Sequence, residues 1–197
     1  AYYNAAVGQF ARRMHDDLID GVHWATASGV ADPKRVAIYG GSYGGYATLV
    51  GVTFTPDVFR AAVDYVGPSS LVTLIKSFPA YWRPFLEGTW YRFVGDPDKD
   101  VDSLKARSPL FRVDSIRTPL MVVQGANDPR VTKLESDQLV IALRDRGVKV
   151  QYLVAPNEGH GFANADNRMA LYRSMELFFA QYLGGRASAT TKPEIEK

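Results

Sequence analysis

Short apolar runs alternate along this chain with segments in which apolar residues recur every three or four positions. The short runs are bounded by turn-forming residues and predict buried strands at residues 36–39, 61–66, 119–124 and 148–154. The segments of helical periodicity predict amphipathic or buried helices at residues 4–26, 43–54, 133–146 and 164–183. This alternation is typical of an α/β protein with a parallel sheet and helices on both of its faces.

Residues 69–113 break the alternation. They are rich in aromatic residues and are interrupted by Pro79, Pro84 and Pro97, which predicts short helices and loops over one end of the sheet. A cap of this kind can wall a substrate pocket, although aromatic residues that only cover a core would have the same composition. We favour the pocket wall.

The strand at residues 36–39 runs directly into a glycine-rich turn and then a helix. Residues 40–44 fit the G-x-S-x-G nucleophile elbow, in which a sharp strand-to-helix turn exposes the oxygen of Ser42. We expect the flanking glycines to be there because a larger side chain two positions before or after the serine would collide with a neighbouring element. The backbone N–H of Tyr43, at the positive end of the following helix, is the candidate oxyanion donor.

Two further loops carry the partners that a serine nucleophile needs. Asp128 follows the third strand, and His160 lies between glycines after the fourth strand. An imidazole takes the proton of the serine during attack, and a carboxylate holds the imidazole in the right tautomer. The chain order Ser, Asp, His is that of an α/β-hydrolase. Ser42, Asp128 and His160 are therefore the predicted catalytic residues, and we interpret His15 and His23 as structural or solvated.

Composition narrows the remaining classes of function. The 197 residues fit one domain, with a core drawn from 46% hydrophobic residues, and we expect an α/β-hydrolase domain at residues 1–184 before a polar, disordered tail at residues 185–197. A net charge of +2 without a basic run argues against a nucleic-acid partner. No apolar run reaches the length of a membrane span, so no membrane partner is expected. Absence of cysteine excludes disulfides and thiol chemistry, but leaves the cellular compartment undecided.

The motifs together resemble the catalytic domain of the prolyl oligopeptidase family, the serine peptidases that include dipeptidyl peptidases and acylaminoacyl peptidases. The resemblance extends from about Ala1 to Leu183, and the segments that carry it are residues 14–17, 40–46, 108–110, 125–131 and 158–162. It implies an α/β-hydrolase fold and cleavage of short peptides through an acyl-enzyme on Ser42. It also implies that Tyr43, Val66 and Val131 line the primary substrate pocket and that Arg130 binds a substrate carbonyl. No metal or cofactor is implied, and the sequence shows no histidine–carboxylate cluster or phosphate-binding loop.

The departures from the family pattern are equally informative. Family members carry several strands before the nucleophile strand, a loop with a second oxyanion donor and an N-terminal β-propeller, none of which this chain contains. We therefore expect only the C-terminal half of the usual strand set, truncated on the N-terminal side. The nucleophile strand would then form an open sheet edge, available to a second copy or to a complementing N-terminal segment.

Three functions remain open from the sequence. The first is a serine peptidase acting on short peptides. The second is a carboxylesterase that uses the same three residues on small esters. The third is a catalytically incomplete chain that needs a partner chain or segment to complete its sheet.

Overall fold

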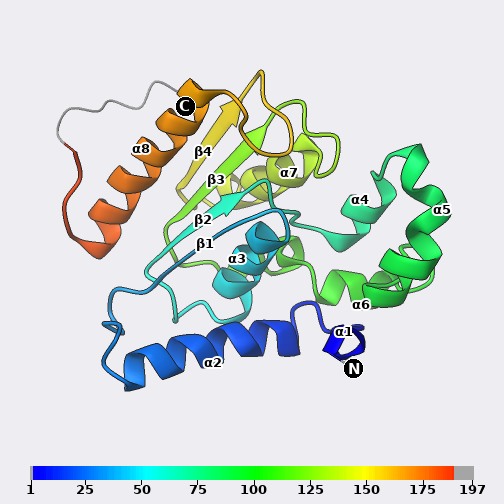
Figure 1. Cartoon of the computed structure of the whole chain (residues 1–197), viewed down its shortest axis with the longest axis horizontal. Helices are drawn as coiled ribbons and strands as arrows, with labels where there is room; N and C mark the ends of the chain where they lie inside the picture. The colour runs from blue at the N-terminus through cyan, green and yellow to red at the C-terminus, as the bar shows by residue number, and fades with distance from the viewer. Residues whose placement is uncertain (1, 189–197) are drawn as a thin grey trace.

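One parallel sheet organises the computed structural model, which describes residues 2–188. Within these residues the strand order is β1-β2-β3-β4, with β1 (Ala37–Gly41), β2 (Ala61–Tyr65), β3 (Leu120–Gly125) and β4 (Val150–Ala155). Each strand begins and ends within two residues of its predicted bounds. Since all the pairings are parallel, the carboxyl ends of the strands meet at one edge of the sheet (Figure 1). The predicted tail at residues 185–197 lies largely outside the described residues.

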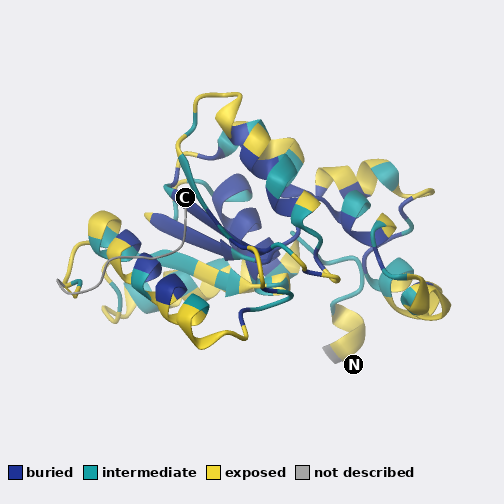
Figure 2. Ribbon diagram, turned by 90° about the horizontal axis from the view of Figure 1, so that it is seen from above, coloured by how far each residue is buried: buried dark blue, intermediate teal, exposed yellow. Residues whose placement is uncertain are grey.

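Helices cover both faces of the sheet, as the alternation of elements predicts. One face packs against α3 (Tyr43–Phe54) and α7 (Lys133–Arg144), and its buried side chains include Leu49, Ala62, Val122 and Leu139. The other face packs against α8 (Ala165–Leu183), where the buried side chains include Val63, Val123, Leu171 and Phe178. Successive strand residues alternate between the two clusters because side chains of a strand point to opposite faces. Figure 2 shows the buried residues concentrated in the strands and on the inner sides of these helices.

The segment between β2 and β3 forms the predicted cap of short helices. It contains α4 (Leu71–Lys76), η1 (Ala80–Trp82), α5 (Arg83–Leu86), the π-helical turn η2 (Glu87–Tyr91), α6 (Val101–Ala106) and η3 (Pro109–Ser115). The helices α4, α5 and α6 lie together at one side of the sheet (Figure 1). None of the described helices is both long and apolar enough to cross a bilayer.

The predicted continuous helix at residues 4–26 is wrong. The structure has a short α1 (Tyr2–Ala5), an irregular segment, and then α2 (Arg13–Ala27). Gly8 and Ala11 take positive φ values of 68° and 54°, which a right-handed helix does not allow. The Gly8 amide instead donates a hydrogen bond to the Phe93 carbonyl at 2.8 Å, so a contact with the cap replaces the local helical bond.

Strand β1 lies at the edge of the sheet within the described chain. Its sequence predicts a strand buried on both faces, and that prediction is wrong, since its residues are only half-buried or exposed. The phenol-bearing side chain of Tyr39 is 45% exposed. The edge position itself agrees with the expectation drawn from the small number of strands.

Candidate active site

Ser42 sits at the tight turn between β1 and α3. Its backbone has φ 57° and ψ −116°, a conformation that costs a non-glycine residue roughly 1–3 kcal/mol. Its amide donates to the Tyr65 carbonyl at 2.9 Å, which continues the β1–β2 pairing into the turn. The Ser42 carbonyl accepts from the Tyr46 amide at 3.0 Å, so the turn is bonded both to β2 and to the first turn of α3. These bonds hold Ser42 at the carboxyl edge of the sheet.

The glycines around Ser42 do not all have the role that the motif predicts. A Cβ atom on Gly40 would lie 2.7 Å from the Gly44 Cα, so strand and helix approach too closely for a side chain there. A Cβ atom on Gly44 would meet no neighbour within 4 Å, which corrects our steric expectation for that position. The second close approach occurs at Gly45, whose Cβ would lie 2.6 Å from the Gly67 Cα.

The three predicted residues form one hydrogen-bonded network. His160 Nε2 lies 2.8 Å from Ser42 Oγ, and His160 Nδ1 lies 2.8 Å from Asp128 Oδ2. Pairing of Nδ1 with a carboxylate assigns the ring proton to Nδ1, which leaves Nε2 as the acceptor for the serine hydroxyl. The loops after β1, β3 and β4 thus bring together residues that are up to 118 positions apart.

Asp128 is 5% exposed, and its second oxygen is held by the backbone. Its Oδ1 accepts from the amides of Arg130 at 2.8 Å and Val131 at 3.0 Å. The side-chain amide of Gln124 approaches Oδ2 at 3.5 Å and is itself fixed by Ser136, whose hydroxyl donates to Gln124 Oε1 at 2.9 Å. This support from Gln124 and Ser136 has no signature in the sequence, because both residues lie in ordinary strand and helix patterns.

Within the described residues, no hydrogen bond joins the other two histidines, or the nearby acid Glu158, to this network. His15 is buried, with its Nε2 3.1 Å from Thr55 Oγ1, and burial lowers its pKa. His23 lies on an exposed part of α2. The carboxylate of Glu158 accepts from the amides of Ala163 and Asn164 at 2.7 and 2.9 Å, and so fixes the chain before α8.

A pocket of about 190 Å³ opens beside Ser42 and His160. Of the predicted substrate-binding residues, Tyr43, Arg130 and Val131 line it, whereas Val66 is buried and does not. The other lining residues are Phe10, Tyr46, Pro68, Leu71, Leu74, Phe78, Trp82 and Trp90. Most of them come from the cap, as the aromatic composition suggests, but Phe10 comes from the irregular segment after α1.

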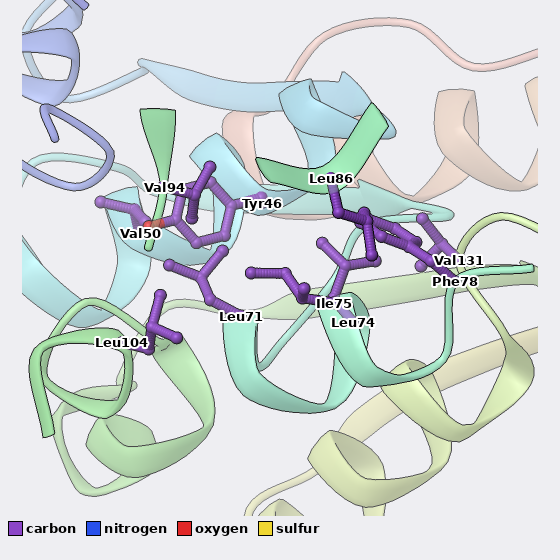
Figure 3. Close-up of a cluster of buried hydrophobic side chains, with 10 residues drawn as sticks. All are labelled: Tyr46, Val50, Leu71, Leu74, Ile75, Phe78, Leu86, Val94, Leu104 and Val131. Atoms are coloured by element: carbon purple, nitrogen blue, oxygen red, sulfur yellow. The ribbon is translucent and has the colours of Figure 1, made fainter. Parts of the chain in front are cut away.

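The cap side of the pocket rests on a layer of buried apolar side chains (Figure 3). Figure 3 shows Leu74 and Ile75 of α4 in the middle of this layer, with Tyr46 and Leu71 on one side of them and Phe78 and Val131 on the other. Burial in this region raises the pKa of Tyr43 to about 12, so its phenol stays neutral near pH 7. Apolar and aromatic side chains therefore make up most of the pocket lining, and Arg130 supplies the one guanidinium among the lining residues.

Two buried carboxyl groups contact elements that line the pocket, and the sequence pattern does not predict either of them. Glu135 is fully buried and accepts from the amides of Ser69 at 3.0 Å and Ser70 at 2.9 Å, just before α4. Asp64 is also fully buried, against Gly45 and Gly67. Burial is the largest cause that raises the pKa of each carboxyl, and hydrogen bonds partly oppose the rise for Glu135.

A parallel sheet with helices on both faces, a strained serine between strand and helix, and loops that join serine, histidine and aspartate define an α/β-hydrolase. The structure of a Mycobacterium tuberculosis puromycin-hydrolyzing peptidase is similar, with a TM-score of 0.88, 31% identity, and coverage of 96% of this chain and 28% of that one.

The family follows from the whole sequence. The chain belongs to the prolyl oligopeptidase family, whose model matches residues 1–186. It is 52% identical over 193 residues to dipeptidyl aminopeptidase BIII of Pseudoxanthomonas mexicana, with 97% of this chain and 28% of that protein covered. It is 46% identical over 185 residues to dipeptidyl peptidase family member 6 of Caenorhabditis elegans, with 92% of this chain and 25% of that protein covered. The chain thus spans about a quarter of the length of these relatives.

Proposed function

We propose that this chain carries the catalytic centre of a serine peptidase that cleaves short peptides through an acyl-enzyme on Ser42. The observation that carries the proposal is the continuous network from Ser42 Oγ through His160 to Asp128, with both hydrogen bonds at 2.8 Å. Membership of a peptidase family, together with relatives named as dipeptidyl peptidases, favours peptides over small esters as the natural substrates.

The geometry supports a conventional order of proton transfers. His160 Nε2 accepts the proton of Ser42 as its oxygen attacks the scissile carbonyl carbon, and the imidazolium then protonates the departing amine. Asp128 keeps the Nδ1 proton in place and stabilises the imidazolium as it forms. Water then repeats the sequence on the acyl-enzyme, with His160 as the base, and releases the acyl product and free Ser42.

Tyr43 has two roles in this proposal. Its amide is the first of α3, so it has no acceptor within that helix and is available to the oxyanion. Its ring forms part of the pocket wall beside Ser42. We propose that the acyl side chain of the substrate enters this apolar pocket, while the exposed guanidinium of Arg130 reaches a substrate carbonyl at its rim.

The deciding experiment is labelling of the purified chain with a small fluorophosphonate, followed by intact mass and peptide mapping. We expect one adduct, on Ser42, and loss of that adduct in Ser42→Ala. Ser28→Ala serves as the matched control, because this serine is exposed at the end of α2 and its hydroxyl donates to the Trp24 carbonyl, not to the network.

The substrate class is decided by comparing the turnover of dipeptidyl amides with that of p-nitrophenyl esters. The protein used is a preparation that reacts with the fluorophosphonate. Turnover of amides supports the peptidase, whereas turnover of esters alone supports the carboxylesterase. A folded chain that gives no adduct would contradict the proposal and favour the third function, a sheet that requires a partner segment before the centre is active.

A further inference from the structure

A second hollow lies next to the active-site pocket and is separated from it by two aromatic side chains. It has a volume of about 230 Å³ and is lined by Tyr3, Phe10, Thr89, Trp90, Phe93 and Val94. Phe10 and Trp90 also line the pocket that contains Ser42. These two side chains therefore form the partition between the hollows, and none of the residues lining the second hollow is charged.

Trp90 is held in this partition by the unusual backbone of the cap. It belongs to the π-helical turn η2, and its carbonyl accepts from the amides of Val94 at 2.7 Å and Gly95 at 3.1 Å. Its ring meets Phe78 edge to face, with the centroids 4.7 Å apart. Phe78 is itself part of the buried layer under the pocket (Figure 3), so the indole rests on a fixed surface.

Phe10 forms the other half of the partition. It belongs to the irregular segment between α1 and α2, and its ring lies 4.9 Å from Tyr43 and 5.6 Å from Tyr46. The ring contacts of Phe10 are thus with two residues of the elbow helix α3, whereas the ring of Trp90 contacts Phe78 of the cap. Truncating Trp90 therefore opens the partition from the cap side, whereas the ring contacts of Phe10 with Tyr43 and Tyr46 do not involve Trp90.

We propose that Trp90 is a specificity-determining residue that limits the depth of the acyl pocket. With Trp90 in place, the pocket accepts compact apolar side chains or short acyl groups. With a small residue at position 90, the two hollows join, and a longer apolar chain extends past Phe10 toward Phe93 and Val94. This inference rests on the proposed function in one respect, which is that the joined pocket begins at Ser42.

The test compares acyl chains of increasing length in wild type, Trp90→Phe and Trp90→Ala. In Trp90→Ala we expect kcat/KM for p-nitrophenyl octanoate to rise relative to the butyrate by roughly fourfold for each methylene that enters the new space. Trp90→Phe keeps an aromatic side chain in the partition, so we expect a smaller rise in the same ratio of kcat/KM. This variant keeps the test valid if Trp90→Ala fails to fold.

Trp82→Ala is the matched control. Trp82 lines the active-site pocket and packs against Phe78 at 4.9 Å, but it does not line the second hollow. Its removal enlarges the first pocket without joining the two. An equal rise in Trp82→Ala and Trp90→Ala, or no rise in Trp90→Ala, overturns the proposal.

A binding measurement separates this inference from the proposed function. In a Ser42→Ala background, titration calorimetry with butanamide and octanamide reports pocket depth without any chemistry at Ser42. A gain in the octanamide-to-butanamide affinity ratio on adding Trp90→Ala supports the role of Trp90, and an unchanged ratio overturns it. Failure of the fluorophosphonate to label wild type would instead count against the proposed function alone.

Discussion

Gly40 and Gly44 occupy matching positions in the elbow motif but differ in their surroundings. Only at Gly40 would a Cβ atom overlap the neighbouring backbone, at 2.7 Å from the Gly44 Cα. We expect Gly40→Ala to lower the free energy of unfolding by about 1–3 kcal/mol, because strand and helix must separate. The same separation moves Ser42 away from His160, so we expect the rate of fluorophosphonate labelling to fall at least tenfold.

Gly44→Ala is the control for that prediction. Its Cβ enters open space, and alanine favours a helix over glycine by up to about 1 kcal/mol. Urea unfolding and labelling rates of both variants test the pair. Similar losses in Gly40→Ala and Gly44→Ala would show that the contact of Gly40 with the helix is not what shapes the elbow.

Asp64 gives the molecule a pH dependence of stability with a definite sign. Burial, with a smaller contribution from Glu135, raises the pKa of this carboxyl well above its ordinary value, while the Gly67 amide partly opposes the rise. In the unfolded chain the carboxyl loses its proton near pH 4, so above that pH the unfolded state binds fewer protons than the folded state. The free energy of unfolding contributed by Asp64 therefore falls as the pH rises from about 4 toward its folded pKa.

Asp64→Asn removes this dependence while keeping the shape of the side chain. We expect the stability of Asp64→Asn relative to wild type to increase as the pH rises above about 4, as measured by urea unfolding at each pH. Any constant cost of the amide cancels in that comparison. Parallel pH profiles for the two proteins would rule out a raised pKa at Asp64.

At the scale of elements, Glu135 ties α7 to the loop that precedes α4. Its carboxylate accepts from two backbone amides, those of Ser69 and Ser70, and from the hydroxyl of Thr73. Glu135→Ala leaves buried donors without acceptors, and we expect a loss of about 2–5 kcal/mol in the free energy of unfolding. Because α4 supplies Leu71 and Leu74 to the pocket, we also expect weaker binding of apolar acyl groups.

Glu135→Gln distinguishes loss of the hydrogen bonds from loss of the charge. Both backbone bonds end on Oε2, so the amide oxygen of glutamine can keep them, whereas its NH2 group replaces Oε1, the acceptor for Thr73. The stability of Glu135→Gln should therefore fall between those of wild type and Glu135→Ala. Glu87→Ala, at an exposed acid of η2, provides the control. Chemical denaturation measures all three, and an unchanged stability in Glu135→Ala would contradict the anchoring role.

The elements that sequence predicts well are those fixed by local pattern. The strands and the helices α3, α7 and α8 follow from apolar spacing, and the loops of Ser42, Asp128 and His160 follow from their places after strands. The break between α1 and α2 could not be predicted in this way, because the Gly8 amide bonds to Phe93, which lies 85 positions further along the chain. Asp64 and Glu135 were missed for the same reason, since only the folded chain reveals what surrounds them.

At the scale of the whole molecule, the sheet has two edge strands within the described residues, β1 and β4, and β1 is the one that leads into the nucleophile elbow. The amides of Ser42 and Arg60 bond between β1 and the neighbouring β2, so alternate groups of β1, including the amide of Tyr39, face away from the sheet. An edge with a half-buried apolar strand favours pairing with another chain. The chain covers 28% of dipeptidyl aminopeptidase BIII, so most of that relative lies outside the matched region.

We therefore expect the purified chain to self-associate through β1 as its concentration rises. Tyr39→Lys should shift the population toward monomer, because a charged side chain on an edge strand opposes pairing and Tyr39 is 45% exposed already. Sedimentation velocity over a hundredfold range of concentration measures the effect, with Tyr81→Lys on the exposed surface of the cap as the control. A wild-type chain that remains monomeric throughout, or one that Tyr39→Lys and Tyr81→Lys affect equally, would exclude β1 as the associating edge.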